Sequence, residues 1–218
     1  MLRTGGKIRK SASWLHSPEE DYAAKAHESC QLYTKALEGF AHGRLGICCD
    51  ENTGMHSLER QASTKPAPPG RRARRARASL RHGTRGLINA LGVATGQRAW
   101  TIGTTRKATA DVAHLTQASH RLPQMQRDAW VMDHWHTHGS LEGCRLVARW
   151  CKLPFEPASL KKGPQRRAFL RDPSHRHVLP CTPKHGAWLN QAAVFFGVLH
   201  RRFLARGRFR SPKDCARR

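Results

Sequence analysis

Short apolar runs alternate along this chain with segments of helical spacing. Residues 17–40 open with Ser-Pro-Glu-Glu and carry apolar side chains at loosely helical positions, which predicts an amphipathic helix. The run 43–51, GRLGICCDE, is apolar and ends in two acids, as a buried strand of an α/β sheet does. Residues 129–135, AWVMDHW, repeat this pattern and predict a second buried strand.

The remaining segments extend this order. Residues 81–105 place apolar runs on both sides of a Thr-Gly pair, which is the pattern of a hairpin. Segments 106–122 and 140–153 have helical spacing, and a further strand is expected near 177–181. The succession of strands and helices, without an internal repeat, predicts an α/β fold.

The last predicted helix covers residues 185–207. Its apolar side chains are expected on one face: Trp188, Ala192, Phe195, Phe196, Leu199 and Phe203. Arginines follow beside that face, and Gly207 is the expected stop.

The charge narrows the class of partner. The 218 residues, enough for one main domain, include 39 Lys and Arg against 15 Asp and Glu, a formal charge of +24. Such an excess indicates a polyanionic partner, with nucleic acid as the leading candidate. The alternative is a base-composition bias of the gene that enriches arginine throughout.

The basic residues suggest where such a partner would bind. Residues 65–79, KPAPPGRRARRARAS, cannot bury enough apolar surface to form core, so we expect a loop that contacts phosphates or is merely solvated. The candidate DNA-binding residues are Arg71, Arg72, Arg74, Arg75, Arg77, Lys184, Arg201, Arg202 and Arg206.

The cysteines and the apolar runs bear on the compartment. Seven cysteines without a CxxC pair indicate neither a disulfide framework nor a zinc finger, and they fit the reducing cytoplasm. No stretch reaches the roughly 20 apolar residues of a membrane span, and no apolar run follows the basic N-terminus to make a signal peptide.

Two acids close the two predicted buried strands. Asp50 and Asp133 stand at carboxyl ends, where ligands bind in open α/β sheets. If the strands are parallel neighbours the carboxylates converge, and paired carboxylates bind Mg²⁺ or Mn²⁺ for chemistry at phosphate. The alternative is that each acid serves a turn or a helix cap.

A second metal hypothesis uses the histidines of VMDHWHTH. His134, His136 and His138 alternate, so on a strand they would share a face and could bind zinc. The run is short and leads into the turn before Ser140, which we expect to cap the next helix. No glycine-rich phosphate loop and no serine-hydrolase elbow is present.

Several blocks together resemble the bacterial insertion-sequence transposases of the mariner-like DDE class. The resemblance covers roughly residues 5–214 and keeps the order and spacing of the blocks. The blocks are CCDENTGMHSLER (48–60), RHGTRGLINALGVATGQ (81–97), VMDHWHTHGS (131–140), FLRDPSHRHVLPCTPKHGAWLNQ (169–191) and FFGVLHRRFLARGRFRS (195–211).

This resemblance implies an RNase H-like mixed sheet flanked by helices, with three acids that hold two Mg²⁺ ions for DNA cleavage and strand transfer. By position the first acid is Asp50 and the second is Asp133. Where the family writes D-N-x-N-T-H, this chain has His134 and His136, so the histidines correspond to substituted asparagines.

The third acid is missing. The family places its catalytic Glu after Trp-Leu-Asn-Gln and one apolar residue, and this chain has Ala193 there. After Glu156 the only carboxylates are Asp172 and Asp214, neither of them on the last predicted helix. We therefore expect Mg²⁺ (or Mn²⁺) to bind weakly and this copy to be inactive. The alternative is a non-enzymatic nucleic-acid-binding protein derived from a transposase.

The same resemblance suggests a division of the chain. Residues 1–42 correspond to a helical remnant of the linker that follows a helix-turn-helix region, 43–210 to the catalytic domain, and 211–218 to a truncated tail. DNA is the expected partner, together with a second copy of the chain or a full-length transposase.

Overall fold

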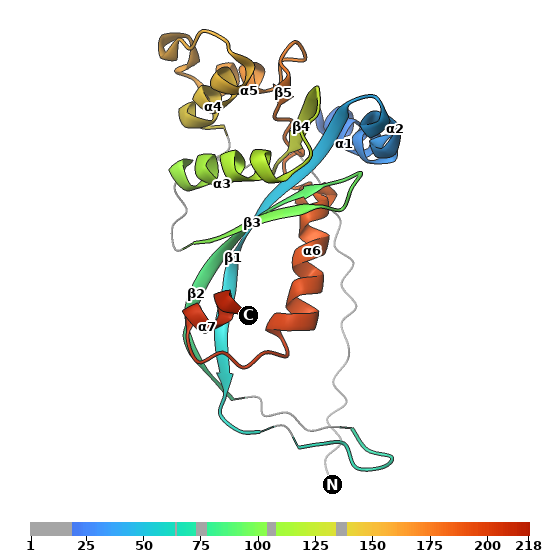
Figure 1. The fold of residues 1–218 in the computed structure, drawn as a ribbon, viewed down its shortest axis with the longest axis vertical. Coiled ribbons are helices and arrows are strands. Elements are labelled where there is room, and N and C mark those ends of the chain that lie inside the picture. Colours follow the sequence, from blue (N-terminus) through green and yellow to red (C-terminus); the bar gives the residue numbers. More distant parts are fainter. Residues whose placement is uncertain (1–18, 64, 73–77, 104–107, 134–138) are drawn as a thin grey trace.

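A mixed sheet runs through the centre of the molecule, as the computed structural model shows for residues 19–63, 65–72, 78–103, 108–133 and 139–218 (Figure 1). Within these ranges the sheet has five strands in the order β3-β2-β1-β4-β5. Their bounds are β1 (Arg44–Arg60), β2 (Ser79–Gly92), β3 (Arg98–Gly103), β4 (Arg127–Val131) and β5 (His177–Val178).

Helices fill the connections between these strands and flank the sheet. The α-helices are α1 (Tyr22–Thr34), α2 (Ala36–Ala41), α3 (Ala108–Arg121), α4 (Leu141–Cys151), α5 (Gly163–Leu170), α6 (Gln191–Leu199) and α7 (Pro212–Arg217). Short helical turns lie at Pro157–Leu160 and Ala187–Leu189, and a π-helical turn, His200–Leu204, extends α6. The predicted fold class, a mixed sheet flanked by helices, is confirmed.

Strand β1 joins the two halves of the sheet. It pairs antiparallel with β2 on one side, and parallel with β4 on the other, where Cys48 is opposite Val131. The parallel arrangement follows from the helical crossover through α3, because parallel neighbours need a long connection. The acids at the ends of β1's buried run and of β4 therefore reach the same edge.

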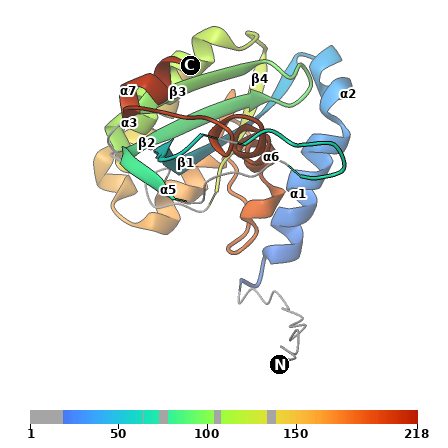
Figure 2. The same cartoon turned by 90° about the horizontal axis from the view of Figure 1, so that it is seen from below.

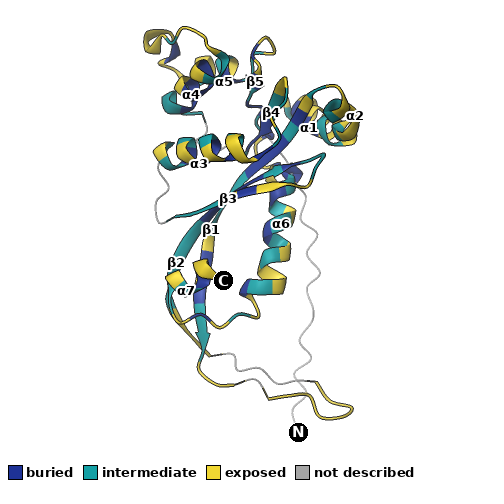
Figure 3. Ribbon diagram, in the orientation of Figure 1, coloured by how far each residue is buried: buried dark blue, intermediate teal, exposed yellow. Residues whose placement is uncertain are grey.

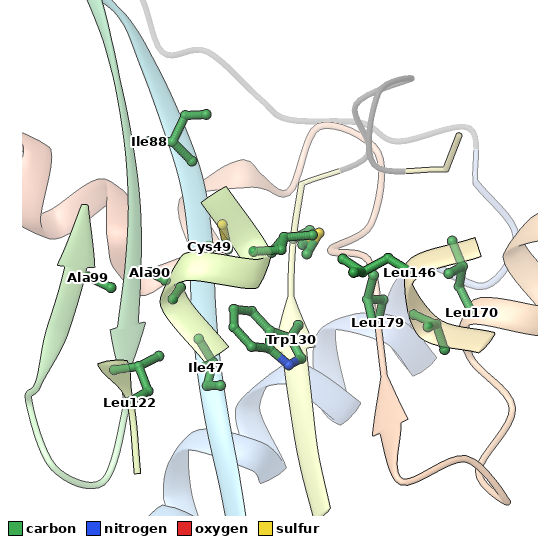
Figure 4. Close-up of a cluster of buried hydrophobic side chains, with 14 of the residues drawn as sticks. Ile47, Cys49, Ile88, Ala90, Ala99, Leu122, Trp130, Leu146, Leu170 and Leu179 are labelled. Atoms are coloured by element: carbon green, nitrogen blue, oxygen red, sulfur yellow. The ribbon is translucent and has the colours of Figure 1, made fainter. Parts of the chain in front are cut away.

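Different helices cover the two faces of the sheet. On one face α3, α4 and α5 cover the main core, in which Trp130 is fully buried among aliphatic side chains from the sheet and these helices (Figure 4). On the opposite face Ala192 of α6 packs with Cys48, Val131 and side chains of α1. Figure 2 shows α6 nearly end-on beside the strands. The side chains of alternate β1 residues thus point into opposite layers of the molecule.

The close approach of α1 to the sheet depends on a glycine. A Cβ at Gly46 would come within 2.3 Å of Leu32 Cδ2, so a side chain at this β1 position would require the Leu32 side chain of α1 to move.

Of the described helices, none is long and apolar enough to cross a membrane.

Most predicted elements are present. Strands β2 and β3 form the antiparallel hairpin, with Gly96 at φ +69° in its turn. Segments 106–122 and 140–153 contain α3 and α4, and Ser140 caps α4 by accepting a 3.1 Å hydrogen bond from the Gly143 N–H. The predicted first helix is two shorter helices, α1 and α2, and helix α5 was not predicted.

The prediction for strand β1 was too short. The strand continues past the acids to Arg60 and remains paired with β2, with irregular register near Asn52–Met55 and His56–Leu58. The polar stretch after Asp50 concealed this extension, because it breaks the apolar run expected of a buried strand. In Figure 3 dark blue is concentrated in the first part of β1, and the described parts of the β1–β2 connection are yellow.

The predicted start of the last helix was also wrong. Helix α6 begins at Gln191 rather than near residue 185, because Asn190 has an extended backbone (φ −77°, ψ 113°) and accepts the Ala192 N–H with its side chain. Trp188 precedes this cap and is 65% exposed, so it does not belong to the buried face of the helix. Ala192 and Phe196 are buried as predicted.

Candidate active site

Asp50 and Asp133 lie at one edge of the sheet, on the face that α6 covers. Continuing the β1–β4 register from Cys48 and Val131 by two residues places the two aspartates opposite each other. Cys48 and Val131 pack with Ala192 of α6, so the side chains two residues further along project from the same face. Parallel pairing thus brings together two carboxylates that are far apart in the sequence.

The start of α6 is anchored beside Asp50. The fully buried Asn190 side chain donates a 2.8 Å hydrogen bond from Nδ2 to the carbonyl oxygen of Cys49, and it caps α6 by accepting the Ala192 N–H at 3.1 Å. Ala193 follows in the first turn, half-buried, with a methyl group where the resemblance places a carboxylate. Position 193 therefore follows directly after the anchored start of α6, and its alanine offers no oxygen ligand.

The environment of Asp50 disfavours its charged form. Burial, with further contributions from the negative charges of Asp133 and Glu51, raises the pKa of Asp50 to about 6, although a 2.8 Å hydrogen bond from the Glu51 N–H opposes the rise. A cation placed between the two carboxylates would remove this repulsion.

We expect Asp50→Asn to stabilise the protein at pH 8 in the absence of divalent metal. The raised native pKa makes protonated Asp50 favourable below about pH 4, and this contribution is lost as the pH rises through about 6. The gain at pH 8 should be about 1–3 kcal/mol, and it should vanish at pH 4. Urea unfolding at both pH values measures it, and equal effects at the two pH values would contradict the assignment.

The two carboxylates suit a single hard cation better than a pair of ions. Two monodentate oxygens with water completing the shell are typical ligands of Mg²⁺, whereas two-ion sites need further carboxylates. Within the described ranges no three His, Cys, Asp or Glu side chains gather as a potential metal site. His134, His136 and His138, the residues of the zinc hypothesis, lie outside the described residues.

The predicted DNA-binding residues lie in several places. Arg71 and Arg72 are exposed in the β1–β2 connection, and Arg74, Arg75 and Arg77 lie outside the described residues. Arg201, Arg202 and Arg206 are exposed at the far end of α6 and just beyond it, whereas the exposed Lys184 lies on the loop before α6. Among the described members of this set, Lys184 thus lies before α6, and Arg201, Arg202 and Arg206 lie after it.

A basic hollow that the prediction missed lies near α7. Its volume is about 480 Å³, and it is lined by Asp214 and four arginines, Arg208, Arg210, Arg217 and Arg218. Arg218 pairs with Asp214 at 2.9 Å, and the Arg208 Nε lies 3.5 Å from Glu59. These two acids offset only part of the positive charge of the four arginines. The RGRFR spacing in the sequence was the available signal, because alternate arginines flank the fully buried Phe209.

Comparison with known protein families decides the affiliation of the chain. Residues 47–215, which include the strands and helices just described around the two aspartates, match the family described as DDE superfamily endonuclease. The chain belongs to the DDE superfamily endonucleases. This DDE domain finds no match among curated protein sequences.

Solved structures support the fold of this DDE endonuclease domain. The Mos1 strand transfer complex matches with a TM-score of 0.54 at 15% identity, over 98% of this chain and 57% of the Mos1 chain. The Mos1 paired-end complex with left transposon end gives 0.55 at 14% identity, over 98% and 58%. The Mos1 mariner paired end complex with Mn gives 0.54 at 14% identity, over 97% and 58%. The chain thus spans less than two thirds of the Mos1 chain.

Proposed function

We propose that this chain is a DDE transposase domain of the bacterial insertion-sequence type that binds DNA and a divalent cation but no longer cleaves. The observation that carries the proposal is the parallel pairing of β1 with β4, because its register, continued by two residues, sets Asp50 opposite Asp133 near the start of α6 that Asn190 anchors to β1. The family match and the Mos1-like fold support the transposase origin, and the substituted third position supports the loss of cleavage.

The residues of the site have different roles in cation binding and in positioning α6. Asp50 and Asp133 would hold one Mg²⁺ or Mn²⁺ ion, which supplies Lewis-acid activation of an oxygen at a phosphate. Asn190 holds the start of α6 against β1, so the geometry of the third position depends on it. Ala193 contributes no charge, and without a third carboxylate the chain cannot fix a second ion in the line of attack.

DNA would approach along the arginine-bearing surfaces. Positive charges for backbone phosphates would come from the exposed Arg201, Arg202 and Arg206, from the arginines of the hollow near α7, and from Arg71 and Arg72. Binding of this kind releases counterions, so it depends strongly on salt and little on sequence.

A salt titration tests the DNA part of the proposal. Between about 50 and 200 mM salt the affinity for a 30-bp duplex should fall roughly 100-fold if about four phosphates are neutralised. Arg208→Ala with Arg210→Ala should lower the slope of log affinity against log salt by about two, since each lost phosphate contact lowers it by about one. Arg149→Ala, exposed on α4, is the matched control and should leave the slope unchanged. Failure of the parent chain to bind the duplex at low salt would contradict the proposal.

A nicking assay with Mn²⁺ tests the catalytic part. We expect no cleavage of supercoiled plasmid DNA above the Asp50→Ala background, since the third ligand is absent. Robust cleavage by the parent chain that Asp50→Ala abolishes would show that two acids suffice. Cleavage by both proteins alike would reveal a contaminating nuclease.

The second candidate is a non-enzymatic nucleic-acid-binding protein, and Ala193 favours it. Such a chain could also join a full-length transposase, or a second copy of itself, as an inactive member of the assembly. Mixed with an active transposase of the same element, it should lower the yield of paired ends in proportion to its concentration. An unchanged yield at excess would restrict its role to DNA.

The proposal also includes a cellular compartment and a division of the chain into three segments. We expect residence in the reducing cytoplasm, because the number and spacing of the seven cysteines indicate no disulfide framework. Residues 1–42 would represent the linker after a helix-turn-helix region, 43–210 the catalytic domain and 211–218 a tail. Residues 212–217 form α7, whose Cys215 is buried with side chains of β1 and β2.

A further inference from the structure

Two polar side chains extend the pair of aspartates into a row across the sheet. Asn89 of β2 is directly opposite Asp50 in the β1–β2 ladder. On the other side Met132 bridges Cys181 in parallel, so the next residues, Asp133 and Thr182, continue the register. The order across four chain segments is Asn89, Asp50, Asp133 and Thr182.

All four side chains belong to the face that α6 covers. Leu87 and Leu91, two residues on either side of Asn89, pack with α6 side chains, whereas Ile88 and Ala90 enter the opposite core (Figure 4). Thr182 follows Cys181 in the segment that pairs with Met132, so the side chains of these two residues point to opposite faces of the sheet. The Thr182 N–H donates a 2.7 Å hydrogen bond to the Met132 carbonyl. The outer members of the row therefore point to the same side as the carboxylates.

The two outer members are buried without a hydrogen-bond partner. Asn89 and Thr182 each have 0% exposure, and neither amide atom of Asn89 nor the Thr182 hydroxyl is bonded within the described part of the chain. A buried amide or hydroxyl of this kind is costly unless another group satisfies it. Asn89 also interrupts the otherwise apolar run LINAL, where a strand core would favour an aliphatic residue.

We propose that Asn89 and Thr182 are positioning residues that hydrogen-bond the Asp50 and Asp133 carboxylates, directly or through one water, and hold them in the orientation that binds a divalent cation. The proposal rests on the proposed function only in assigning a cation to the aspartates. Asp50 Oδ1 already accepts the Glu51 N–H at 2.8 Å, which leaves Oδ2 for the Asn89 amide or the cation.

The chemistry of the donors fits this task. Opposite residues of an antiparallel pair have Cβ atoms about 4.5–5.5 Å apart, within reach of an amide-to-carboxylate hydrogen bond after a rotamer change. A hydroxyl and an amide donate without adding charge, so they orient a carboxylate and leave its affinity for the cation intact. Partners of this kind commonly set metal affinity, and their loss costs about 10–100-fold.

The test replaces each donor by an apolar residue of similar shape. Asn89→Leu and Thr182→Val should each weaken Mn²⁺ binding about 10–100-fold, measured by electron paramagnetic resonance of free Mn²⁺. Thermal unfolding of the metal-free variants should show that both remain folded, so that a loss of Mn²⁺ affinity is not a loss of the fold. Thr182→Ser, which keeps the hydroxyl, should retain parent affinity.

A control and a metal-free measurement complete the test. Ser57→Ala removes another fully buried hydroxyl further along β1 and should leave Mn²⁺ affinity unchanged. In metal-free protein, loss of a donor to the charged form in Asn89→Leu should raise the pKa of Asp50, followed by ¹³C NMR, by about one pH unit.

Two outcomes would overturn the assignment. They are unchanged Mn²⁺ affinity and Asp50 titration in both variants, or a loss of affinity matched by unfolding. None of these measurements uses DNA, so failure of the transposase proposal would be seen separately, in the salt titration and the nicking assay.

Discussion

Ala193→Glu is expected to convert this chain from one that does not cleave DNA into one that does so with Mn²⁺. The substitution places a carboxylate in the first turn of α6, beside Asp50 and Asp133, on a helix that Asn190 anchors to β1. The gain should be about 100-fold or more over the parent, since misplacing a reacting group by about 1 Å already costs about that much. A supercoiled-plasmid nicking assay measures it.

In the Ala193→Glu variant, the dipole of α6 and the neighbouring acids have opposite effects on the energy of the new negative charge. A negative charge at the N-terminus of α6 is favourable toward the helix dipole, whereas a third carboxylate adds to the repulsion that already raises the pKa of Asp50. We therefore expect Ala193→Glu to unfold at a lower temperature than the parent without metal and to be stabilised by Mn²⁺ more than the parent is.

Ala193→Gln is the matched control for the glutamate. It has nearly the same shape and no charge, so it should neither nick DNA nor gain stability from Mn²⁺. Nicking by the glutamine variant, or no nicking and no Mn²⁺ stabilisation by the glutamate variant, would contradict the identification of position 193 as the third ligand site.

Asn190→Ala should have the largest effect on stability among these substitutions. It removes the N-cap of α6, worth about 1 kcal/mol, and it leaves the Cys49 carbonyl without the Asn190 amide, which costs a further 1–3 kcal/mol or so. The expected total of about 2–4 kcal/mol should lower the melting temperature by roughly 5–15 °C for a domain of this size. Calorimetry or thermal circular dichroism measures the shift.

Ser140→Ala separates the two contributions. Ser140 caps α4 by accepting the Gly143 N–H at 3.1 Å, a bond within its own helix, so the loss of this cap should cost only about 1 kcal/mol. If the Asn190 and Ser140 variants lose the same stability, the bond from Asn190 to β1 contributes nothing. In the Ala193→Glu background, Asn190→Ala should also reduce nicking, because the third carboxylate would lose its fixed position.

The pattern of the sequence predicted most elements because their signals are local. The apolar runs before Asp50 and Asp133, the Thr-Gly turn of the hairpin and the Ser140 cap each depend on residues close in the chain, and the structure confirms them. Where a local signal was ambiguous, prediction was wrong: the helical periodicity around Trp188 did not reveal that Asn190 would start α6.

Pairing across the sheet determined the rest, since it depends on residues far apart in the sequence. Identifying Asp50 and Asp133 as candidates, and Ala193 as the altered third position, required only the sequence and its resemblance to a family. That β1 and β4 are parallel neighbours, that burial raises the pKa of Asp50, and that Asn89 and Thr182 flank the acids unpaired required the tertiary structure. Register and burial are properties of the packed sheet, and an isolated strand has neither.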